Sequence, residues 1–483
     1  MANANSPPHA IIFPFMAQGH TIPLLDLAKV LSFRGVKVTI ITTPSNAKQI
    51  SSHFATKFSS TISTHVIPFP VVDGLPLGYE NTKDLTSDDQ RLPFLRATLK
   101  LKQPFESYLR DLVDTGDRPI CAICDFFLGW AVTVSSSLNI PGILFYGMGV
   151  LSTKISFSVF INQEYVRTLM NGEKLENVSG LACPFPLILD DFPVFKDINN
   201  PSKKFFQENG GDGGTTTCWG VLCNSFEELE GEFVTALEES FGRSRVKAWC
   251  VGPLLLYDDP EENKTFPKDG NVSKSSISSW LDEQHEDVIY VSFGTQSYIS
   301  KSQMDEIAQG LDSAGHPFIW VVRSSSWTPP AEWEERVKGR GLVIREWVDQ
   351  RSILAHLVIG GFLSHCGWNS VLESLSMGVP ILTWPIGAEQ PLNAKLVVHV
   401  LKAGLAMDST LDEVREEGVV YGCNAISSGV KELMGEESGR LARKRAKEIG
   451  LMARNAVEKD GSSSKKLDHL INSLKEHSVR LNS

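Results

Sequence analysis

One stretch decides the fold: VIGGFLSHCGWNSVLESLSMGVPILTWP, residues Val358–Pro385. Two apolar runs flank a polar run and a segment whose apolar residues recur at helical spacing. We predict a buried strand, then a helix over Asn369–Met377 that stops at Gly378, then a second buried strand. A strand, a helix and a strand in this order form a parallel sheet covered by helices. The stretch therefore predicts an α/β domain.

The same alternation runs through both halves of the chain. In the first half we predict a strand at His9–Phe13, a helix at Ile22–Leu31 with Pro23 in its first turn, and a β-branched strand at VKVTIITT. In the second half, DVIYVSFG and PFIWVVR are predicted strands that flank a helix over residues 301–314. Two doubly wound, Rossmann-like domains are therefore expected, with ligands at the carboxyl ends of their strands.

The boundary between the domains is predicted from a change in composition. The chain has 483 residues, which exceeds what one hydrophobic core usually organises. Residues 258–279 are rich in charged residues, Asn, Gly and Ser and have no apolar periodicity. We predict an N-terminal domain over 1–250, a linker over 251–279, a C-terminal domain over 280–460, and a final helix over 461–483 that packs back on the first domain. A ligand is expected in a cleft between the domains.

Composition excludes several classes of function. The hydrophobic share is 42% and the charged share 21%, as in ordinary globular proteins, and the formal net charge of -11 argues against a nucleic-acid partner. The apolar region Ile140–Phe160 is interrupted by Pro, Gly and Lys, so no membrane span is expected. The start of the chain lacks the basic segment of a signal peptide. The eight cysteines follow no framework spacing, and we expect Cys121, Cys124 and Cys366 to be buried, reduced thiols in a cytoplasmic monomer.

A polar site is predicted at the start of the helix that follows FLSHCGW. The helix N-terminus offers backbone N–H groups and the positive end of the helix dipole beside His365, Asn369 and Ser370. These groups suit a diphosphate. Glu373 lies one turn along the same face, where its carboxylate can accept hydrogen bonds from a ribose diol.

Polar and aromatic residues follow other predicted strands as well. Trp347 at a strand end suits stacking on a nucleotide base, and Gln350 is close to it in the chain. The pair Glu389–Gln390 follows another strand and offers the acceptor and amide groups that vicinal sugar hydroxyls require. Gly294–Thr295 follows a third strand and suits a close approach of the backbone to phosphate.

Taken together, residues 347–390, WVDQRSILAHLVIGGFLSHCGWNSVLESLSMGVPILTWPIGAEQ, resemble the signature box of the plant family 1 UDP-glycosyltransferases. The resemblance extends over nearly the whole chain through FPFMAQGHTIPLLDLA, CDFFLGW, LCNSFEELE, WCVGPL, VSFGTQ and GSSSKKLDHLI. It implies the GT-B fold, in which two Rossmann-like domains face each other across a cleft. It also implies a hexosyltransferase that moves a sugar, with glucose expected, from a UDP-sugar to a small lipophilic acceptor.

The resemblance also implies roles for single residues. Uracil is expected to stack on Trp347 and to contact the backbone of Val348, and the ribose is expected to meet Gln350 and Glu373. The residues expected at the phosphates are Gly294, Thr295, His365, Gly367, Asn369 and Ser370. The residues expected at the sugar are Trp368, Glu389 and Gln390.

The first half supplies a candidate base. His20, in FMAQGHTIP, lies in the predicted loop after the first strand, and an imidazole is suited to take a proton from a hydroxyl near neutral pH. Asp125 ends a later strand, where its carboxylate can orient His20 and stabilise the imidazolium. The resemblance implies these two roles, base and orienting partner.

A single displacement with inversion follows from these parts. His20 deprotonates the acceptor, whose oxygen attacks the anomeric carbon from the face opposite UDP, so that an α-linked sugar becomes a β-glycoside. The helix N-terminus and His365 are expected to stabilise the leaving diphosphate without a metal, and the chain contains no D-x-D motif.

The acceptor and the exact donor are less closely defined. A flavonoid or another phenolic is expected in an apolar pocket whose predicted lining is Phe15, Phe94, Phe126, Phe127 and Tyr146. Many family members carry Asp at the position of Glu389, and relatives often carry Thr or Ser at the position of Gly147. A pentose or deoxyhexose donor therefore stays open as an alternative, as does a C-glycoside product.

Two other classes of function use a similar scaffold. An NAD(P)-dependent oxidoreductase needs a glycine-rich fingerprint after its first strand, and PFMAQGH lacks those glycines. A non-catalytic binder of UDP-sugars or other small molecules needs no base, so His20 and Asp125 argue against it.

Overall fold

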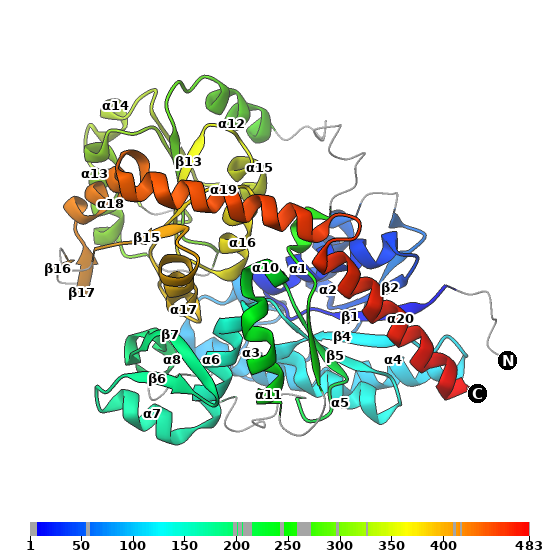
Figure 1. The fold of residues 1–483 in the computed structure, drawn as a ribbon. Coiled ribbons are helices and arrows are strands. Elements are labelled where there is room, and N and C mark those ends of the chain that lie inside the picture. The colour runs from blue at the N-terminus through cyan, green and yellow to red at the C-terminus, as the bar shows by residue number, and fades with distance from the viewer. Residues whose placement is uncertain are drawn as a thin grey trace. The chain divides into compact units, whose positions relative to one another are not determined.

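The chain folds into two compact units (Figure 1). The computed structural model describes residues 7–54, 58–196, 200, 205, 215–241, 246–257, 272–295, 299–324, 327–408, 412–415 and 418–482. Unit 1 comprises the described residues within 1–183, 193–257 and 455–483, and unit 2 those within 184–192 and 258–454.

Unit 1 is built on a seven-stranded sheet of order β3-β2-β1-β4-β5-β8-β9 whose paired strands are all parallel. Its strands are β1 His9–Phe13, β2 Lys37–Thr42, β3 Ile62–Val66, β4 Cys121–Asp125, β5 Gly142–Tyr146, β8 Gly220–Cys223 and β9 Lys247–Cys250. The helices around it are α1 Gln18–Phe33, α2 Pro44–His53, α3 Arg91–Leu99, α4 Lys102–Asp114, α5 Gly129–Ser137, α6 Val150–Ile161, α7 Gln163–Met170, α8 Pro193–Lys196, α10 Glu227–Glu230, α11 Val234–Ser240 and α20 Ser462–Asn482. The central strands β1, β4 and β5 are buried along their whole length, as the continuous apolar runs predict for a sheet covered on both faces.

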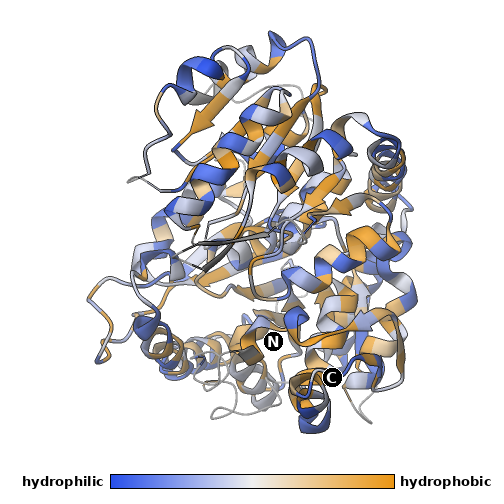
Figure 2. Ribbon diagram, turned by 90° about the vertical axis from the view of Figure 1, so that its left-hand side faces the viewer, coloured by the Kyte–Doolittle hydropathy of each residue, from blue (hydrophilic) through white to orange (hydrophobic). Residues whose placement is uncertain are grey.

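Unit 2 is built on a six-stranded parallel sheet of order β12-β11-β10-β13-β14-β15. Its strands are β10 Val288–Ser292, β11 Phe318–Val321, β12 Gly341–Ile344, β13 Ile359–Ser364, β14 Ile381–Thr383 and β15 Gly404–Ala406. Its helices are α12 Val272–Asp282, α13 Lys301–Ala314, α14 Trp333–Arg336, α15 Gln350–Leu354, α16 Trp368–Ser376, α17 Gln390–Lys395, α18 Cys423–Gly435 and α19 Glu437–Val457, of which the last ends in unit 1. Separate clusters of buried side chains alternate along β10 and β13, so the sheet has a core on each face. The strands in Figure 2 are coloured mainly as hydrophobic.

Two small two-stranded sheets complete the described elements. They are β6 Leu175–Val178 with β7 Leu181–Leu187, and β16 Asp412–Arg415 with β17 Gly418–Tyr421. Neither pair belongs to a large sheet.

Most predicted elements are present, and one helix boundary was wrong. The helix predicted at Ile22–Leu31 begins earlier, at Gln18, because the backbone N–H groups of His20 and Thr21 already bond to the Ala17 carbonyl. Pro23 consequently lies inside the helix rather than in its first turn, and His20 lies on the helix rather than in a loop.

The unit boundaries differ in part from the predicted ones. Residues 251–257 of the predicted linker group with unit 1, and the linker's last part is already helix α12. Residues 258–271 lie outside the described residues. Residues 184–192, predicted within the first domain, group with unit 2, and helix α20 groups with unit 1.

Cys121, Cys124 and Cys366 are buried, and burial raises the pKa of the Cys121 and Cys366 thiols to about 12. Within the described ranges, no helix combines the length and the apolar character needed to cross a membrane.

Candidate functional site

His20 and Asp125 are brought together by the pairing of β1 with β4. The two strands are adjacent and in parallel register, with Phe13 opposite Cys124, so both end at the same edge of the sheet. Helix α1 starts shortly after β1 and carries His20 in its first turn, while Asp125 is the last residue of β4. His20 Nδ1 lies 2.8 Å from Asp125 Oδ2.

The surroundings of this pair fix the imidazole. The Asp125 side chain is fully buried, and its other oxygen, Oδ1, accepts a hydrogen bond of 3.0 Å from the backbone N–H of Phe127. The His20 side chain is 26% exposed. Because a buried carboxylate is an acceptor, His20 Nδ1 donates to it, and the lone pair of the neutral ring is then on Nε2. This arrangement gives a histidine that can accept a proton at Nε2 while Asp125 stabilises the resulting cation.

Aromatic side chains surround His20. The centroids of the Phe15, Phe126 and Phe127 rings lie 5.4, 5.7 and 5.2 Å from that of the imidazole. Phe94 contacts Phe15 edge-on at 6.0 Å, and Tyr146 stacks on Phe126 at 5.1 Å. The five predicted acceptor residues therefore form one cluster. Phe15, Phe94 and Tyr146 are buried, whereas Phe126 and Phe127 are half-buried, so the latter two are the better candidates for contact with a ligand.

In unit 2, His365 lies between two glycines. Strands β10 and β13 are paired with Ser292 opposite Ser364, so the segments after them leave the sheet side by side. A Cβ atom would lie 2.7 Å from His365 Nε2 if added to Gly294, and 2.6 Å if added to Gly367. Gly294 has φ +77°, a left-handed conformation that side chains disfavour. The backbone at Gly294 therefore lies close to the imidazole of His365, and its close approach to phosphate stays a prediction.

His365 is held neutral at neutral pH. Burial lowers its pKa to about 4, and its Nδ1 is buried without a hydrogen-bond partner in the part of the chain that the structure describes. A buried polar atom without a partner is costly unless a ligand or water satisfies it. The ring also has a hydrogen bond to the Ser292 backbone, and a neutral imidazole carries only one N–H. A nearby anion would favour protonation, which places an N–H on both ring nitrogens.

The start of helix α16 carries the other predicted phosphate residues. Its N-cap is Gly367, which supplies no side-chain cap, so the helix start keeps the character of an anion site. Asn369 and Ser370 lie in its first turn, and Thr295 is exposed after β10. The Trp368 side chain is only 2% exposed, so the backbone of this residue is the part available for the predicted contact with the sugar.

The predicted ribose residues form a hydrogen-bonded network. Gln350 Nε2 donates to Glu373 Oε2 at 2.7 Å and to Ser370 Oγ at 3.0 Å, and its Oε1 accepts from the Tyr290 hydroxyl at 3.2 Å. Arg351 Nε donates to the other Glu373 oxygen at 3.1 Å. These contacts fix the orientation of the Glu373 carboxylate. Tyr290 and Arg351 were missed by the sequence reasoning, although Arg351 adjoins Gln350 in the chain.

The loop before α16 is strained and held by a third missed residue. Cys366 is a non-glycine residue with φ +63°, and its carbonyl accepts a hydrogen bond of 3.0 Å from Asn393 Nδ2. Asn393 is fully buried on α17. Left-handed backbone at a non-glycine residue persists only where its surroundings enforce it. Because burial raises its thiol pKa to about 12, Cys366 has a structural role, as predicted.

The remaining predicted residues lie at strand ends of unit 2. Gln390 Oε1 accepts from the backbone N–H groups of Ile386 and Gly387 at 2.8 and 2.9 Å, which leaves its amide N–H₂ as the group to donate to a sugar. Glu389 is the N-cap residue of α17. Trp347 is 54% exposed, as a stacking surface requires, and Val348 beside it is buried. No group of three or more His, Cys, Asp or Glu side chains suited to a metal is found among the described residues.

Comparisons with known proteins agree with this geometry. A family model described as "UDP-glucoronosyl and UDP-glucosyl transferase" matches residues 275–425, and one described as "Glycosyltransferase, N-terminal domain" matches residues 9–256. UDP-glycosyltransferase 73C5 of Arabidopsis thaliana is 35% identical over 98% of this chain and 97% of its own. Scopoletin glucosyltransferase of Nicotiana tabacum is 35% identical over 97% of this chain and 98% of its own.

Solved structures are similar as well. Glycyrrhiza uralensis UGT73P12, complexed with glycyrrhetinic acid 3-O-monoglucuronide, has a TM-score of 0.83 at 30% identity over 98% of this chain and 97% of its own. Medicago truncatula UGT71G1, complexed with UDP-glucose, has a TM-score of 0.80 at 27% identity over 98% of this chain and 100% of its own.

Proposed function

The chain belongs to the plant family 1 UDP-glycosyltransferases, enzymes of the GT-B fold, and from this premise we propose that it transfers glucose from UDP-glucose to a hydroxyl of a small phenolic such as a flavonoid, with inversion to a β-glycoside. The observation that carries the proposal is the 2.8 Å contact between His20 and the buried Asp125, because it prepares a base for the acceptor.

In the proposed reaction, His20 Nε2 takes the proton of the acceptor hydroxyl. The acceptor oxygen forms its bond to the anomeric carbon as the bond from that carbon to the UDP oxygen breaks. Asp125 stabilises the imidazolium that forms. One proton thus moves to His20 and one bond is exchanged for another, with UDP as the leaving group.

The donor is assigned to unit 2. We assign uracil to Trp347 and the Val348 backbone, and the ribose to Gln350 and the oriented carboxylate of Glu373. The sugar is assigned to Glu389, to the amide of Gln390 and to the backbone of Trp368. The diphosphate is assigned to the start of α16 and to neighbouring residues, namely Gly294, Thr295, His365, Gly367, Asn369 and Ser370.

The leaving diphosphate is the group whose charge grows during the reaction. A helix N-terminus and a histidine donor can stabilise that charge without a metal ion. His365 supports this assignment because its buried Nδ1 has no partner within the described ranges. The site needs no metal for the proposed reaction.

The acceptor class is inferred from the aromatic cluster around His20 and from the relatives. One relative is named a scopoletin glucosyltransferase, and Phytolacca americana UGT2, a solved structure 28% identical to this chain, is complexed with UDP-2fluoro-glucose and pterostilbene. The half-buried Phe126 and Phe127 suit a flat aromatic acceptor. We place the enzyme in secondary metabolism as a cytoplasmic monomer.

Two observations favour an alternative donor. Glu389 and Gly147 depart from the residues frequent in the family, and Arabidopsis thaliana UGT89C1, 27% identical to this chain, is complexed with UDP-L-rhamnose. A pentose or deoxyhexose donor is therefore the second candidate. C-glycoside formation would use the same residues.

A panel assay tests the proposal. The protein is incubated without added metal with UDP-glucose, UDP-xylose or UDP-rhamnose and with phenolic, terpenoid and hormone acceptors, and the products are identified by mass. Acid hydrolysis separates O-glycosides from acid-stable C-glycosides, and proton NMR couplings report the anomeric configuration. The expected result is an acid-labile β-glucoside of a phenolic. UDP binding without product from any pair would instead support a non-catalytic binder.

A further inference from the structure

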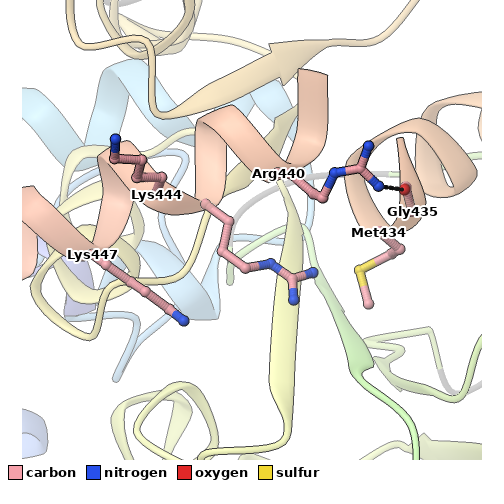
Figure 3. Close-up of a pocket in the computed structure, with 6 residues that line it drawn as sticks. Met434, Gly435, Arg440, Lys444 and Lys447 are labelled. Carbon is pink, nitrogen blue, oxygen red and sulfur yellow. Dashed lines mark hydrogen bonds between the residues drawn. The ribbon is translucent and has the colours of Figure 1, made fainter. Parts of the chain in front are cut away.

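A basic pocket lies in unit 2 apart from the residues assigned to UDP-glucose. Its volume is about 500 Å³, and it is lined by Met434 and Gly435 at the end of α18 and by Arg440, Arg443, Lys444 and Lys447 of α19. We call these six residues the basic pocket. Figure 3 shows the labelled cationic side chains projecting from one helix, with Arg440 turned towards Gly435.

The basic pocket is at the opposite end of the sheet from the proposed donor site. Asp287, the ion-pair partner of Arg443, directly precedes β10. A Cβ added to Gly361, near the start of β13, would lie 2.9 Å from Met434 Sδ. The donor residues instead follow the carboxyl ends of these strands. Since a strand rises about 3.3 Å per residue, the strands β10 and β13 separate the two places by about 15 Å.

The positive charge of the basic pocket is only partly balanced. Arg440 Nη1 donates to the Gly435 carbonyl at 2.9 Å, which leaves its charge unneutralised, and Arg443 pairs with Asp287. Lys444 and Lys447 are exposed, and neither forms an ion pair with any residue that the structure describes. Arg443 Nε is buried and has no acceptor among the same residues.

The spacing of these cations opposes helix stability. Residues 440, 443, 444 and 447 stand three or four positions apart on α19, and like charges at this spacing repel each other. The chain as a whole carries a net charge of -11, so this concentration of cations is a local feature. A solvated helix face would keep the repulsion and the unsatisfied Arg443 Nε. A bound anion would relieve the repulsion through its own negative charge.

We propose that the basic pocket binds a compact anion that carries two or more phosphate charges. Guanidinium groups recognise phosphate through directed N–H donors, and lysines add point charge, so the lining has both kinds of group. A volume of about 500 Å³ fits a small phosphorylated molecule. The ligand is a free phosphorylated metabolite or the headgroup of a phospholipid, and the phosphate chemistry is the same for both.

The test uses the full chain with the proposed donor site filled. Isothermal titration calorimetry measures the binding of inorganic pyrophosphate in the presence of saturating UDP, and a parallel sedimentation assay uses phosphatidylcholine vesicles with and without phosphatidic acid. The variant carries Lys444→Glu and Lys447→Glu. A matched control carries Lys459→Glu and Lys465→Glu, two exposed lysines of unit 1, and has the same net charge. Circular dichroism and UDP affinity check that both variants fold.

The expected result is saturable binding by the wild-type protein that the Lys444/Lys447 variant weakens by about tenfold or more and the control variant leaves within about twofold. Pyrophosphate binding identifies a free ligand, and binding only to phosphatidic-acid vesicles identifies a headgroup. The proposal is overturned if neither probe binds, or if both double variants weaken binding equally. UDP binding tests the proposed function separately, because pyrophosphate binding at the basic pocket does not depend on bound UDP.

Discussion

Replacing Asp125 by asparagine tests the proposed proton transfer without a change in side-chain size. The wild-type carboxylate faces a neutral His20 in the resting enzyme and an imidazolium in the transition state. The amide of the Asp125→Asn variant has one acceptor oxygen where the carboxylate has two, so it cannot accept from both His20 Nδ1 and the Phe127 N–H, and it also loses the negative charge. Turnover should therefore fall while the binding of UDP-glucose, which is assigned to unit 2, should not change.

The size of the effect follows from the distance between the charges. The charge centres of two groups joined by this hydrogen bond are expected to lie about 4 Å apart. At that distance two opposite unit charges attract each other by about 4 kcal/mol at an effective dielectric constant of about 20. Since about 1.4 kcal/mol of transition-state energy is worth a factor of ten, turnover should fall by about 10³-fold if the proton is fully transferred. The burial of Asp125 argues against a smaller value from solvent screening.

The assay is initial-rate kinetics with a phenolic acceptor, together with calorimetry of UDP-glucose binding. Unit 1 offers a control of the same residue types, because His9 Nδ1 lies 3.3 Å from Oδ1 of Asp117, which is partly exposed and also pairs with Lys37. His9 begins β1, at the end of the strand away from His20, so Asp117→Asn should leave turnover unchanged. An Asp125→Asn enzyme that turns over within about threefold of wild type would refute the assigned role of Asp125.

Three further changes test other parts of the structure. Gly294→Ala should destabilise the fold by about 1–3 kcal/mol in urea denaturation and weaken UDP binding, because the φ of +77° is strained for Ala and the added Cβ would meet His365; unchanged stability would contradict the described packing. Burial lowers the pKa of His365 from 6.5 to about 4, so the unfolded state binds more protons between these pH values. The wild-type free energy of unfolding should therefore fall as the pH drops from 6.5 to 4, by up to about 3 kcal/mol more than that of the His365→Asn variant. If the two proteins lose stability in parallel over this range, His365 is not buried as described. Asp191→Asn should cost about 3 kcal/mol of stability, because Asp191 is 3% exposed and its Oδ2 lies 2.6 Å from Lys395 Nζ; a loss below about 0.5 kcal/mol in urea would show that the pair is not stabilising.

Local patterns predicted most of the elements that position the site. The helix predicted at residues 301–314 has the bounds of α13, and the strand predicted at His9–Phe13 is β1. The start of α1 was missed because no Ser, Thr, Asp or Asn caps it and because the proline was expected near the first turn. A capping signal was absent, so the sequence offered only the apolar periodicity.

Residue type and position relative to strand ends predicted the candidate site residues, but not the side chains that hydrogen-bond to them. Arg351 and Tyr290 reach the Gln350 and Glu373 side chains from different elements, and Asn393 reaches the Cys366 carbonyl from a helix 27 residues further along the chain. Such contacts depend on how elements pack in three dimensions. Trp368 is a second example: its place in the motif did not indicate that its indole would be buried.

The grouping of residues 184–192 with the second half restricts how the protein can be divided. Lys395 at the end of α17 contacts this segment three times: through the Asp191 carboxylate, the Pro186 carbonyl at 2.9 Å, and the Phe185 ring, whose centroid is 5.6 Å from Nζ. A fragment that begins at residue 258 would strip this ammonium group of all three. Chimeras that exchange halves between relatives should accordingly transplant the nine residues 184–192 together with the C-terminal half, so that Lys395 of helix α17 keeps its own counter-charge.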